Sequence, residues 1–185
     1  MSVQTIQTDR LDPIQRSKDF KLGMRQLASG LSIVTTQYAG GRFGILSTSV
    51  SSVSVDPPAL LVCVNRSASA YKSMVSSESF CVNLLAEGDE SVADSFASSK
   101  LRHERFKERA WYELVTGAPA LEGCLGSFDC HIVDALHFET HDILVGAVQA
   151  VKFWETTRQP LIYYNGAYAN LREEPTLNTV STSAK

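Results

Sequence analysis

The sequence has no run of lysine or arginine and no strong excess of charge. Its 185 residues include 17 lysines and arginines and 20 aspartates and glutamates, for a formal net charge of −3. Nucleic acids and anionic membranes are bound through clustered positive charge, so neither is expected as a partner. No apolar stretch approaches the roughly 20 residues needed to cross a membrane. The polar N-terminus has no apolar signal core, and we therefore expect a cytoplasmic protein.

Several binding motifs are also missing. No G-x-G-x-x-G follows a predicted strand, so a Rossmann dinucleotide site is not supported. His131, His137 and His141 could suggest a metal site, but a spacing of four residues suits ligands mainly on a helix, and strand and turn are predicted here. We expect no metal. The cysteines form no C-x-x-C pair and are expected to be buried thiols: Cys63, Cys81, Cys124 and Cys130.

Length and a hydrophobic content of 44% fit one domain with a single core. Residues 1–16 show no apolar period and predict a mobile N-terminal arm, while the polar tail 172–185 is expected to be disordered. The domain between them spans 17–171. It should open with a short amphipathic helix from Ser17, with Phe20, Met24 and Leu27 on one buried face and Gly30 as its C-terminal cap.

Strand patterns dominate the rest of the chain. Apolar and β-branched runs predict strands at 31–38, 43–55, 59–65, 80–85, 126–137, 143–153 and 161–164, and helices at 68–77, 87–97 and 101–107. The run at 59–65 is continuous enough to predict a strand buried on both faces. Short turns between many strands favour a mainly β, antiparallel fold with peripheral helices, most simply a small barrel.

Hydroxyl groups are concentrated between Ser47 and Ser54, where five serines and one threonine stand between two apolar runs. A solvated, serine-rich strand edge is the plainer interpretation. A row of hydroxyls beside free backbone amides can also bind a phosphate or the polar edge of a heteroaromatic ring. The segment is therefore the first candidate for a ligand site.

A set of short motifs occurs between residues 17 and 171. They are, in chain order, 20–30 (FKLGMRQLASG), 34–36 (VTT), 44–58, 62–67 (VCVNRS), 80–85 (FCVNLL), 96–97 (FA), 104–106 (ERF), Trp111, 116–119 (TGAP) and 160–168 (PLIYYNGAY). In their order and spacing these motifs resemble those of the short flavin reductases that serve as reductase components of two-component flavin-dependent monooxygenases.

The resemblance implies a split β-barrel that works as a homodimer, with flavin at the subunit interface. The implied cofactor-binding residues are Ile45, Leu46, Ser47, Thr48, Ser49, Ser51, Ser52, Cys63, Val64, Asn65, Ser67, Phe96, Ala97, Ser98, Ser99, Phe106 and Tyr168. Residues 46–49 would face the isoalloxazine ring. Ser51, Ser52 and the group at 65–67 would hold the ribityl chain and phosphate, with 97–99 offering backbone donors to an anion.

Some of these residues have a second interpretation. Arg66 either contacts the phosphate or is a solvated loop charge. Phe106 either stacks on the adenine of FAD or belongs to the core. Tyr168 either walls the nicotinamide pocket or packs structurally.

The implied catalytic contact is His141. In the family, a turn written G-D-H or G-T-H places a histidine near the nicotinamide. Here the turn reads Glu139-Thr140-His141-Asp142, so glutamate replaces the glycine. A turn histidine that hydrogen-bonds the backbone is the alternative. No general acid or base is assigned, because the cofactor carries the chemistry.

The function implied is hydride transfer from NADH to FAD or FMN, with reduced flavin passing to a separate monooxygenase. The alternatives are a tightly bound flavin that reduces a quinone or ferric chelate, and a flavin-binding protein without turnover. A pyridoxamine-phosphate oxidase type of barrel would need basic residues that the serine-rich segment lacks. Paired polar clusters at 51–52 and 98–99 favour FAD slightly, and the lack of a basic pair favours NADH over NADPH.

Overall fold

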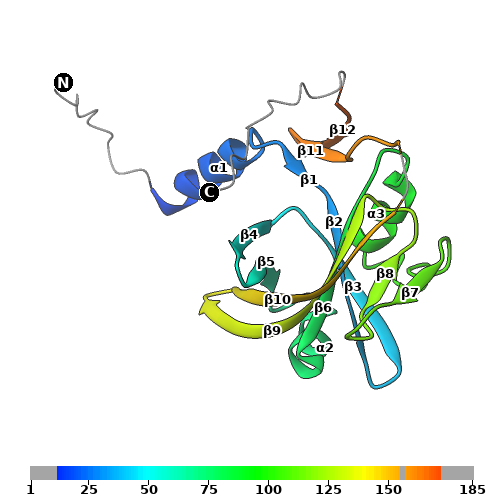
Figure 1. Ribbon diagram of the computed structural model, residues 1–185. Coiled ribbons are helices and arrows are strands. Elements are labelled where there is room, and N and C mark those ends of the chain that lie inside the picture. The colour runs from blue at the N-terminus through cyan, green and yellow to red at the C-terminus, as the bar shows by residue number, and fades with distance from the viewer. Residues whose placement is uncertain (1–11, 155–156, 172–185) are drawn as a thin grey trace, which may run out of the picture.

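The structure is a computed structural model that describes residues 12–154 and 157–171. In this part of the chain there are three helices and twelve strands (Figure 1). In chain order they are α1 (Pro13–Met24), β1 (Ser29–Gly30), β2 (Ser32–Tyr38), β3 (Gly41–Ser47), β4 (Val50–Val55), β5 (Pro58–Asn65), α2 (Tyr71–Ser77), β6 (Ser79–Leu84), α3 (Glu90–Ala97), β7 (Trp111–Glu113), β8 (Pro119–Leu121), β9 (Gly126–Phe138), β10 (His141–Phe153), β11 (Ile162–Tyr164) and β12 (Ala167–Ala169). The predicted mainly β architecture with peripheral helices is confirmed.

Seven strands form one antiparallel sheet in the order β3-β2-β6-β9-β10-β5-β4. The long β9–β10 hairpin carries two register shifts, at Val145/Gly146 and at Val148/Ala150, and such bulges bend a sheet. At the first shift the Phe80 ring packs so closely that a Cβ on Gly146 would lie 2.5 Å from its Cζ atom. The sheet curls round on itself as a result (Figure 1).

The curled sheet is an open barrel. Its two edges are β3 and β4, and no ladder joins them within residues 12–154 and 157–171. The two edges are nevertheless consecutive in the chain, separated only by Thr48 and Ser49. The barrel expected from the sequence is therefore not closed by hydrogen bonds; the covalent chain itself connects its edges.

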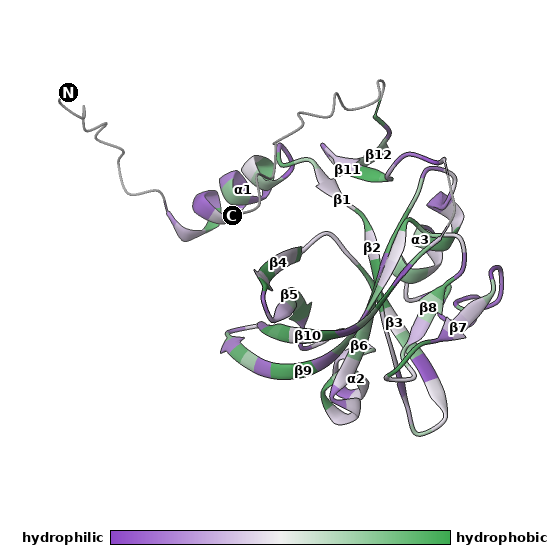
Figure 2. Cartoon of the chain, in the orientation of Figure 1, coloured by the Kyte–Doolittle hydropathy of each residue, from purple (hydrophilic) through white to green (hydrophobic). Residues whose placement is uncertain are grey.

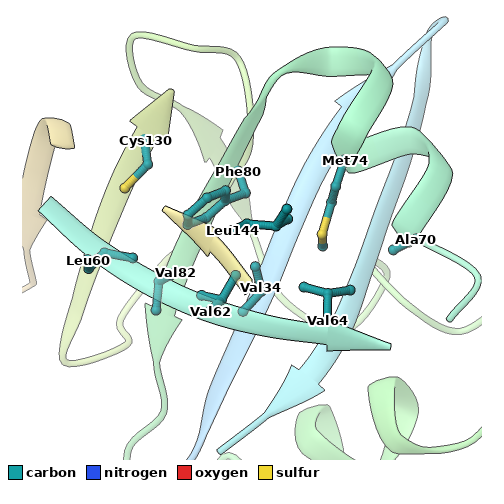
Figure 3. Packing of buried hydrophobic residues seen from close by; sticks show 10 residues of the cluster. All are labelled: Val34, Leu60, Val62, Val64, Ala70, Met74, Phe80, Val82, Cys130 and Leu144. Carbon is teal, nitrogen blue, oxygen red and sulfur yellow. The ribbon is translucent and has the colours of Figure 1, made fainter. Parts of the chain in front are cut away.

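Two apolar clusters position the site. The first lies between the sheet and α2 (Figure 3), and its buried members are Val34, Leu60, Val62, Val64, Ala70, Met74, Phe80, Val82, Cys130 and Leu144. The second fixes α3 against the sheet, with the buried members Leu31, Ile33, Leu85, Val92, Ala93, Phe96, Leu121, Cys124 and Leu161. Because burial of each large apolar side chain contributes about 1.5–3 kcal/mol, α2 and α3 are firmly placed.

β5 is buried on one face only, which corrects the prediction of burial on both. Leu60, Val62 and Val64 point into the core, whereas the alternate residues Cys63 and Asn65 are half-buried. Side chains alternate across a strand, so an antiparallel sheet with one packed face leaves every second residue available. That second face of β5 is free to line a cavity.

The first helix differs from its prediction in both start and burial. It begins at Pro13 rather than Ser17, because the Asp12 carboxylate caps it by accepting a 2.8 Å hydrogen bond from the amide two residues on. Gly30 lies in β1 and does not cap the helix. No residue of α1 is buried in the single chain, and Phe20 is 66% exposed. The helix stands apart from the main sheet (Figure 2).

The prediction of a helix at 101–107 is wrong. This segment is a series of turns, in which the Glu104 amide donates to the Leu101 carbonyl at 2.9 Å and the Lys107 amide to the Glu104 carbonyl at 3.2 Å. Phe106 adopts a left-handed φ of 68°, which no α-helix continues through. The other two predicted helices are present as α2 and α3.

Residues 1–11 and 172–185, which include most of the predicted arm and the whole predicted tail, lie outside the described residues. In the described part, no helix is long and apolar enough to cross a membrane. No group of three or more His, Cys, Asp or Glu side chains that could hold a metal is found there either. All four cysteines are free, and all but Cys63 are buried as expected.

Candidate functional site

The hydroxyl-rich segment lies where the chain passes from β3 to β4. Ser47 is buried, and its Oγ accepts a hydrogen bond from the Ser49 amide at 3.1 Å. The Ser49 hydroxyl donates to the Cys63 carbonyl on β5 at 3.2 Å. These bonds fix a sharp bend between the two sheet edges, and Thr48 at its tip is exposed.

A first cavity of about 500 Å³ opens beside this bend. It is bordered by the ends of β3, β5 and α3, the start of β10 and the turns after α3. Its lining residues are Ile45, Leu46, Ser47, Thr48, Ser49, Cys63, Asn65, Ser67, Ala68, Ser69, Phe96, Ala97, Ser99, Arg102, Arg105 and His141. Apolar side chains, hydroxyls and two guanidinium groups thus meet in one space of the size that small-molecule sites have.

Arg105 ties the walls of this cavity together. Its guanidinium donates to four backbone carbonyls, those of Gly44 at 3.0 Å, Ser95 at 2.9 Å, Phe96 at 3.0 Å and Ser98 at 3.3 Å. Burial, and then the charge of Arg102, lowers the pKa of Arg105. With a reference pKa above 12, arginine stays protonated at neutral pH. Arg105 therefore supplies a fixed positive charge and joins β3 to the end of α3.

His141 lines the cavity at the start of β10, opposite Asn65 of β5. Its Nδ1 lies 2.8 Å from the Thr140 hydroxyl. Glu139 adopts a left-handed φ of 50°, a backbone conformation that glycine enters most easily. The substitution at Glu139 leaves the turn intact.

A buried carboxylate holds the loop behind His141. Asp142 accepts a 2.5 Å hydrogen bond from the Tyr71 hydroxyl, and its Oδ1 lies 2.8 Å from His137 Nδ1. Those two bonds keep the pKa of Asp142 below its ordinary value. Arg66 approaches the same pair, with Nε 3.9 Å from Asp142 Oδ1, and it does not line the first cavity. Of its two interpretations, the structure favours a charge that organises the loop.

A second cavity of about 600 Å³ adjoins the first, and the two share Leu46, Ser47, Thr48 and Ala97. Its remaining lining residues are Leu31, Asp94, Tyr163, Gly166, Ala167 and Tyr168. The rings of Tyr163 and Tyr168 lie 6.3 Å apart in an edge arrangement. The shared residues make the bend at 46–48 a common wall, so ligands in the two cavities would meet there.

Most of the predicted site residues border these two cavities, but five do not. Val64 belongs to the core, and Ser51 and Ser52 border a third, mainly apolar cavity of about 350 Å³. Ser98 caps α3, and its carbonyl accepts from Arg105. Phe106 packs edge-on against Phe96 and at a tilt against Trp111, with ring centroids 5.1 and 4.8 Å away, and so belongs to the second apolar cluster.

The residues that sequence reasoning missed include all three charged groups of the two cavities apart from His141. Arg102 and Arg105 line the first cavity, and Asp94 lines the second. The motif at 104–106 contains Arg105, but Phe106 was the residue that drew attention. The lack of basic residues in the serine-rich segment carries no weight against a phosphate site, because distant turns supply them.

The antiparallel, open barrel carries a cationic, hydroxyl-lined cavity beside one with two tyrosines, which is the chemistry that a phosphorylated ring ligand next to a second ring would need. The chain belongs to the flavin reductase family: residues 24–172 match the flavin reductase like domain. The family predicted from the sequence motifs is thereby confirmed.

The curated relatives are similar over most of their length. An FMN reductase (NADH), RutF, of Agrobacterium fabrum is 44% identical over 154 residues, which cover 83% of this chain and 88% of the relative. The protein of the same name from Yersinia enterocolitica is 36% identical over 181 residues, covering 94% and 99%.

Solved structures show the same fold. A homologue of nitrilotriacetate monooxygenase component B from Mycobacterium thermoresistibile superposes with a TM-score of 0.82 at 26% identity, covering 94% of this chain and 98% of its own. BorF, the flavin reductase component of a bacterial two-component tryptophan halogenase, gives 0.76 at 28% identity, covering 85% and 99%.

Proposed function

We propose that this protein transfers a hydride from NADH to a flavin held in the first cavity, and releases the reduced flavin to a separate oxygenase. The observation that carries the proposal is the common wall of the two cavities, which allows two planar rings to be held side by side. The names of the curated relatives support NADH as donor and FMN as acceptor. The names of the structural relatives support an oxygenase or halogenase partner.

The first cavity fits a flavin in chemistry as well as size. Ile45, Leu46 and Phe96 offer apolar surface to a ring system, and the hydroxyls at 47–49 offer donors to its polar edge. Arg102 would bind the phosphate, and Arg105, whose N–H groups already donate to carbonyls and to Ser69, would add positive charge beside it. Gly44 is part of this fit, because a Cβ there would lie 2.6 Å from the Phe96 ring and displace a wall of the cavity.

The contribution of the chain is binding and orientation. When bound, the flavin supplies the hydride-accepting ring. The residues at 46–48 would fix the distance between the two rings. His141, which lines only the first cavity, would contact the nicotinamide where that ring reaches over the flavin. His141 is exposed and hydrogen-bonded only to Thr140 among the described side chains, which suits a positioning contact more than proton transfer.

The test is steady-state oxidation of NADH by the purified full chain, with FMN or FAD added in excess over enzyme. Rates that saturate with added flavin support the proposal and name the preferred flavin. Flavin that stays bound with no NADH oxidation would leave a binding protein. Oxidation that requires a quinone or ferric chelate would instead make the flavin a resident cofactor with another acceptor.

We also propose that the protein works as a homodimer in the cytoplasm. The dimer is supported by large apolar side chains that a single chain leaves uncovered, on α1 and on the outer part of the β9–β10 hairpin. They include Phe20, Leu136, Phe138 and Phe153. Association of two copies would cover exposed apolar side chains of this size.

A further inference from the structure

The second cavity holds a carboxylate as its one charged group in the described part of the chain. That group is Asp94 on α3, and the other residues around the cavity are aliphatic, hydroxyl-bearing, aromatic or glycine. The first cavity differs sharply, since two arginines line it. The two neighbouring spaces therefore prefer ligand groups of different charge.

Asp94 is held in place yet available to a ligand. Its Oδ1 accepts a hydrogen bond from the Tyr168 hydroxyl at 2.7 Å, and the side chain is exposed. Burial and then this hydrogen bond raise the pKa of Tyr168, so the tyrosine stays a donor. No hydrogen bond to Oδ2 is found among the described residues. A carboxylate anchored through one oxygen presents the other to a ligand donor.

Asp94 also lies close to where the two cavities meet. It stands one helical turn before Ala97, which borders both spaces. Residues three apart lie on the same side of a helix. A ligand that reaches from the common wall along the second cavity would therefore pass this carboxylate.

We infer that Asp94 binds the hydroxyls of the adenosine ribose of the hydride donor, and so selects NADH against NADPH. The inference rests on the proposed function. A carboxylate can accept from both hydroxyls of a free ribose, as acidic residues do in other NAD-binding folds. The 2′-phosphate of NADPH would bring like charge beside it and would remove one of the donors.

One cation lies near the second cavity without lining it. Arg25 follows α1 and would approach a Cβ on Gly166 to 3.9 Å, across the turn between β11 and β12. Arg25 is not among the residues that line the cavity, so Asp94 is the charged side chain that a ligand there contacts.

The experiment compares the full-length protein with Asp94→Asn and Glu90→Gln. Both variants remove one negative charge from α3, but Glu90 does not line the cavity. We expect Asp94→Asn to lower the ratio of kcat/KM for NADH to that for NADPH about tenfold, which corresponds to one charge-assisted hydrogen bond. The change should fall on the donor KM, with the flavin KM and kcat nearly constant. Glu90→Gln should keep the ratio of the unmodified protein.

A binding measurement tests the preference for NAD⁺ over NADP⁺ independently of the rate of turnover. Calorimetric titration of the flavin-free protein with NAD⁺ and NADP⁺ should give tighter binding of NAD⁺, and Asp94→Asn should remove most of that difference. Equal use of NADH and NADPH by the unmodified protein, or an unchanged ratio in Asp94→Asn, would overturn the inference. Failure to oxidise NADH with any flavin would instead count against the proposed function, while a binding preference lost in Asp94→Asn would still support the role of Asp94.

Discussion

Arg105 shows how a single side chain connects the fold to the site. Its hydrogen bonds reach carbonyls on β3 and at the end of α3, which are separated by about fifty residues of sequence, and its charge lines the first cavity. Arg102, three residues earlier, lines the same cavity but makes no side-chain hydrogen bond within the described residues. We therefore expect different effects on stability and on flavin binding when Arg105 and Arg102 are each replaced.

We predict that Arg105→Ala lowers the free energy of unfolding by about 2–4 kcal/mol, because the carbonyls that it satisfies lose their donor. Arg102→Ala should change that energy by less than about 0.5 kcal/mol and weaken flavin binding by about tenfold through loss of a phosphate contact. Denaturant unfolding and flavin titration measure the two effects. Equal loss of stability in both variants would contradict this division.

The Asp142 carboxylate should make stability depend on pH. Its pKa is lower in the folded protein than in the unfolded chain, so its stabilising effect is present above the unfolded value and is lost as pH falls through the folded one. We predict that Asp142→Asn has a lower melting temperature than the unmodified protein at pH 7. The difference should shrink below a pH of about 4. A difference that does not change with pH would show that the charge is not responsible.

For single residues, the sequence predicted site residues that belong to short local motifs and missed those whose partners are distant in the chain. The hydroxyls at 47–49 and the residues at 96–97 follow from short motifs, and they line the cavities. Arg105 and Asp94 could not be chosen, because their partners come from distant parts of the chain: Gly44 for the arginine and Tyr168 for the aspartate. The function of a charged residue depends on which groups the fold places beside it.

Strand β3 and helix α3 pack closely at Gly44, where the Phe96 ring of α3 lies against the strand. We predict that Gly44→Ala destabilises the protein by about 1–3 kcal/mol and weakens flavin binding, because the new methyl group would push the Phe96 ring towards the first cavity. Gly30→Ala is the matched control, since nothing lies within 4 Å of its added Cβ. Thermal unfolding and flavin titration of both variants test this, and equal behaviour would contradict it.

The long strands were predictable, as was the short β11 within the predicted run at 161–164, but the other short strands were not. The runs that became β2, β5, β9 and β10 show clear apolar patterns, whereas β1, β7, β8 and β12 have only two or three residues and no period to detect. The start of α1 was missed although Asp12-Pro13 is a standard helix start. The helix expected at 101–107 is not formed. The segment consists of turns, and Arg105 within it donates to carbonyls of α3 and β3, which the sequence pattern does not indicate.

For the whole molecule, the apolar surface of the single chain predicts association. We expect the unmodified protein to sediment as a dimer, and Phe20→Asp or Phe138→Asp to shift it towards the monomer, because these rings are 66% and 70% exposed in one chain. Val75→Asp, on α2, is a control for an added surface charge. If Phe20→Asp and Phe138→Asp both sediment like the unmodified protein, the proposed dimer is contradicted.

The fold class was predictable from the sequence, but the way the sheet closes was not. Many short strands indicate an antiparallel barrel, yet no sequence pattern shows that β3 and β4 leave their edges unpaired. That outcome depends on the bulges in β9–β10 and on the tight packing of Phe80 against Gly146, which set the curvature of the whole sheet.

The unpaired edges also bear on how fast ligands can be exchanged. At the bend from β3 to β4 the walls of the first cavity are linked by the chain and by hydroxyl bonds such as that from Ser49 to Cys63, and no strand ladder crosses there. Widening the bend would break the two Ser49–Cys63 hydrogen bonds, one from the Ser49 hydroxyl and one from the Cys63 amide, each worth about 1 kcal/mol. Opening the first cavity at this bend would therefore not require the sheet to unfold.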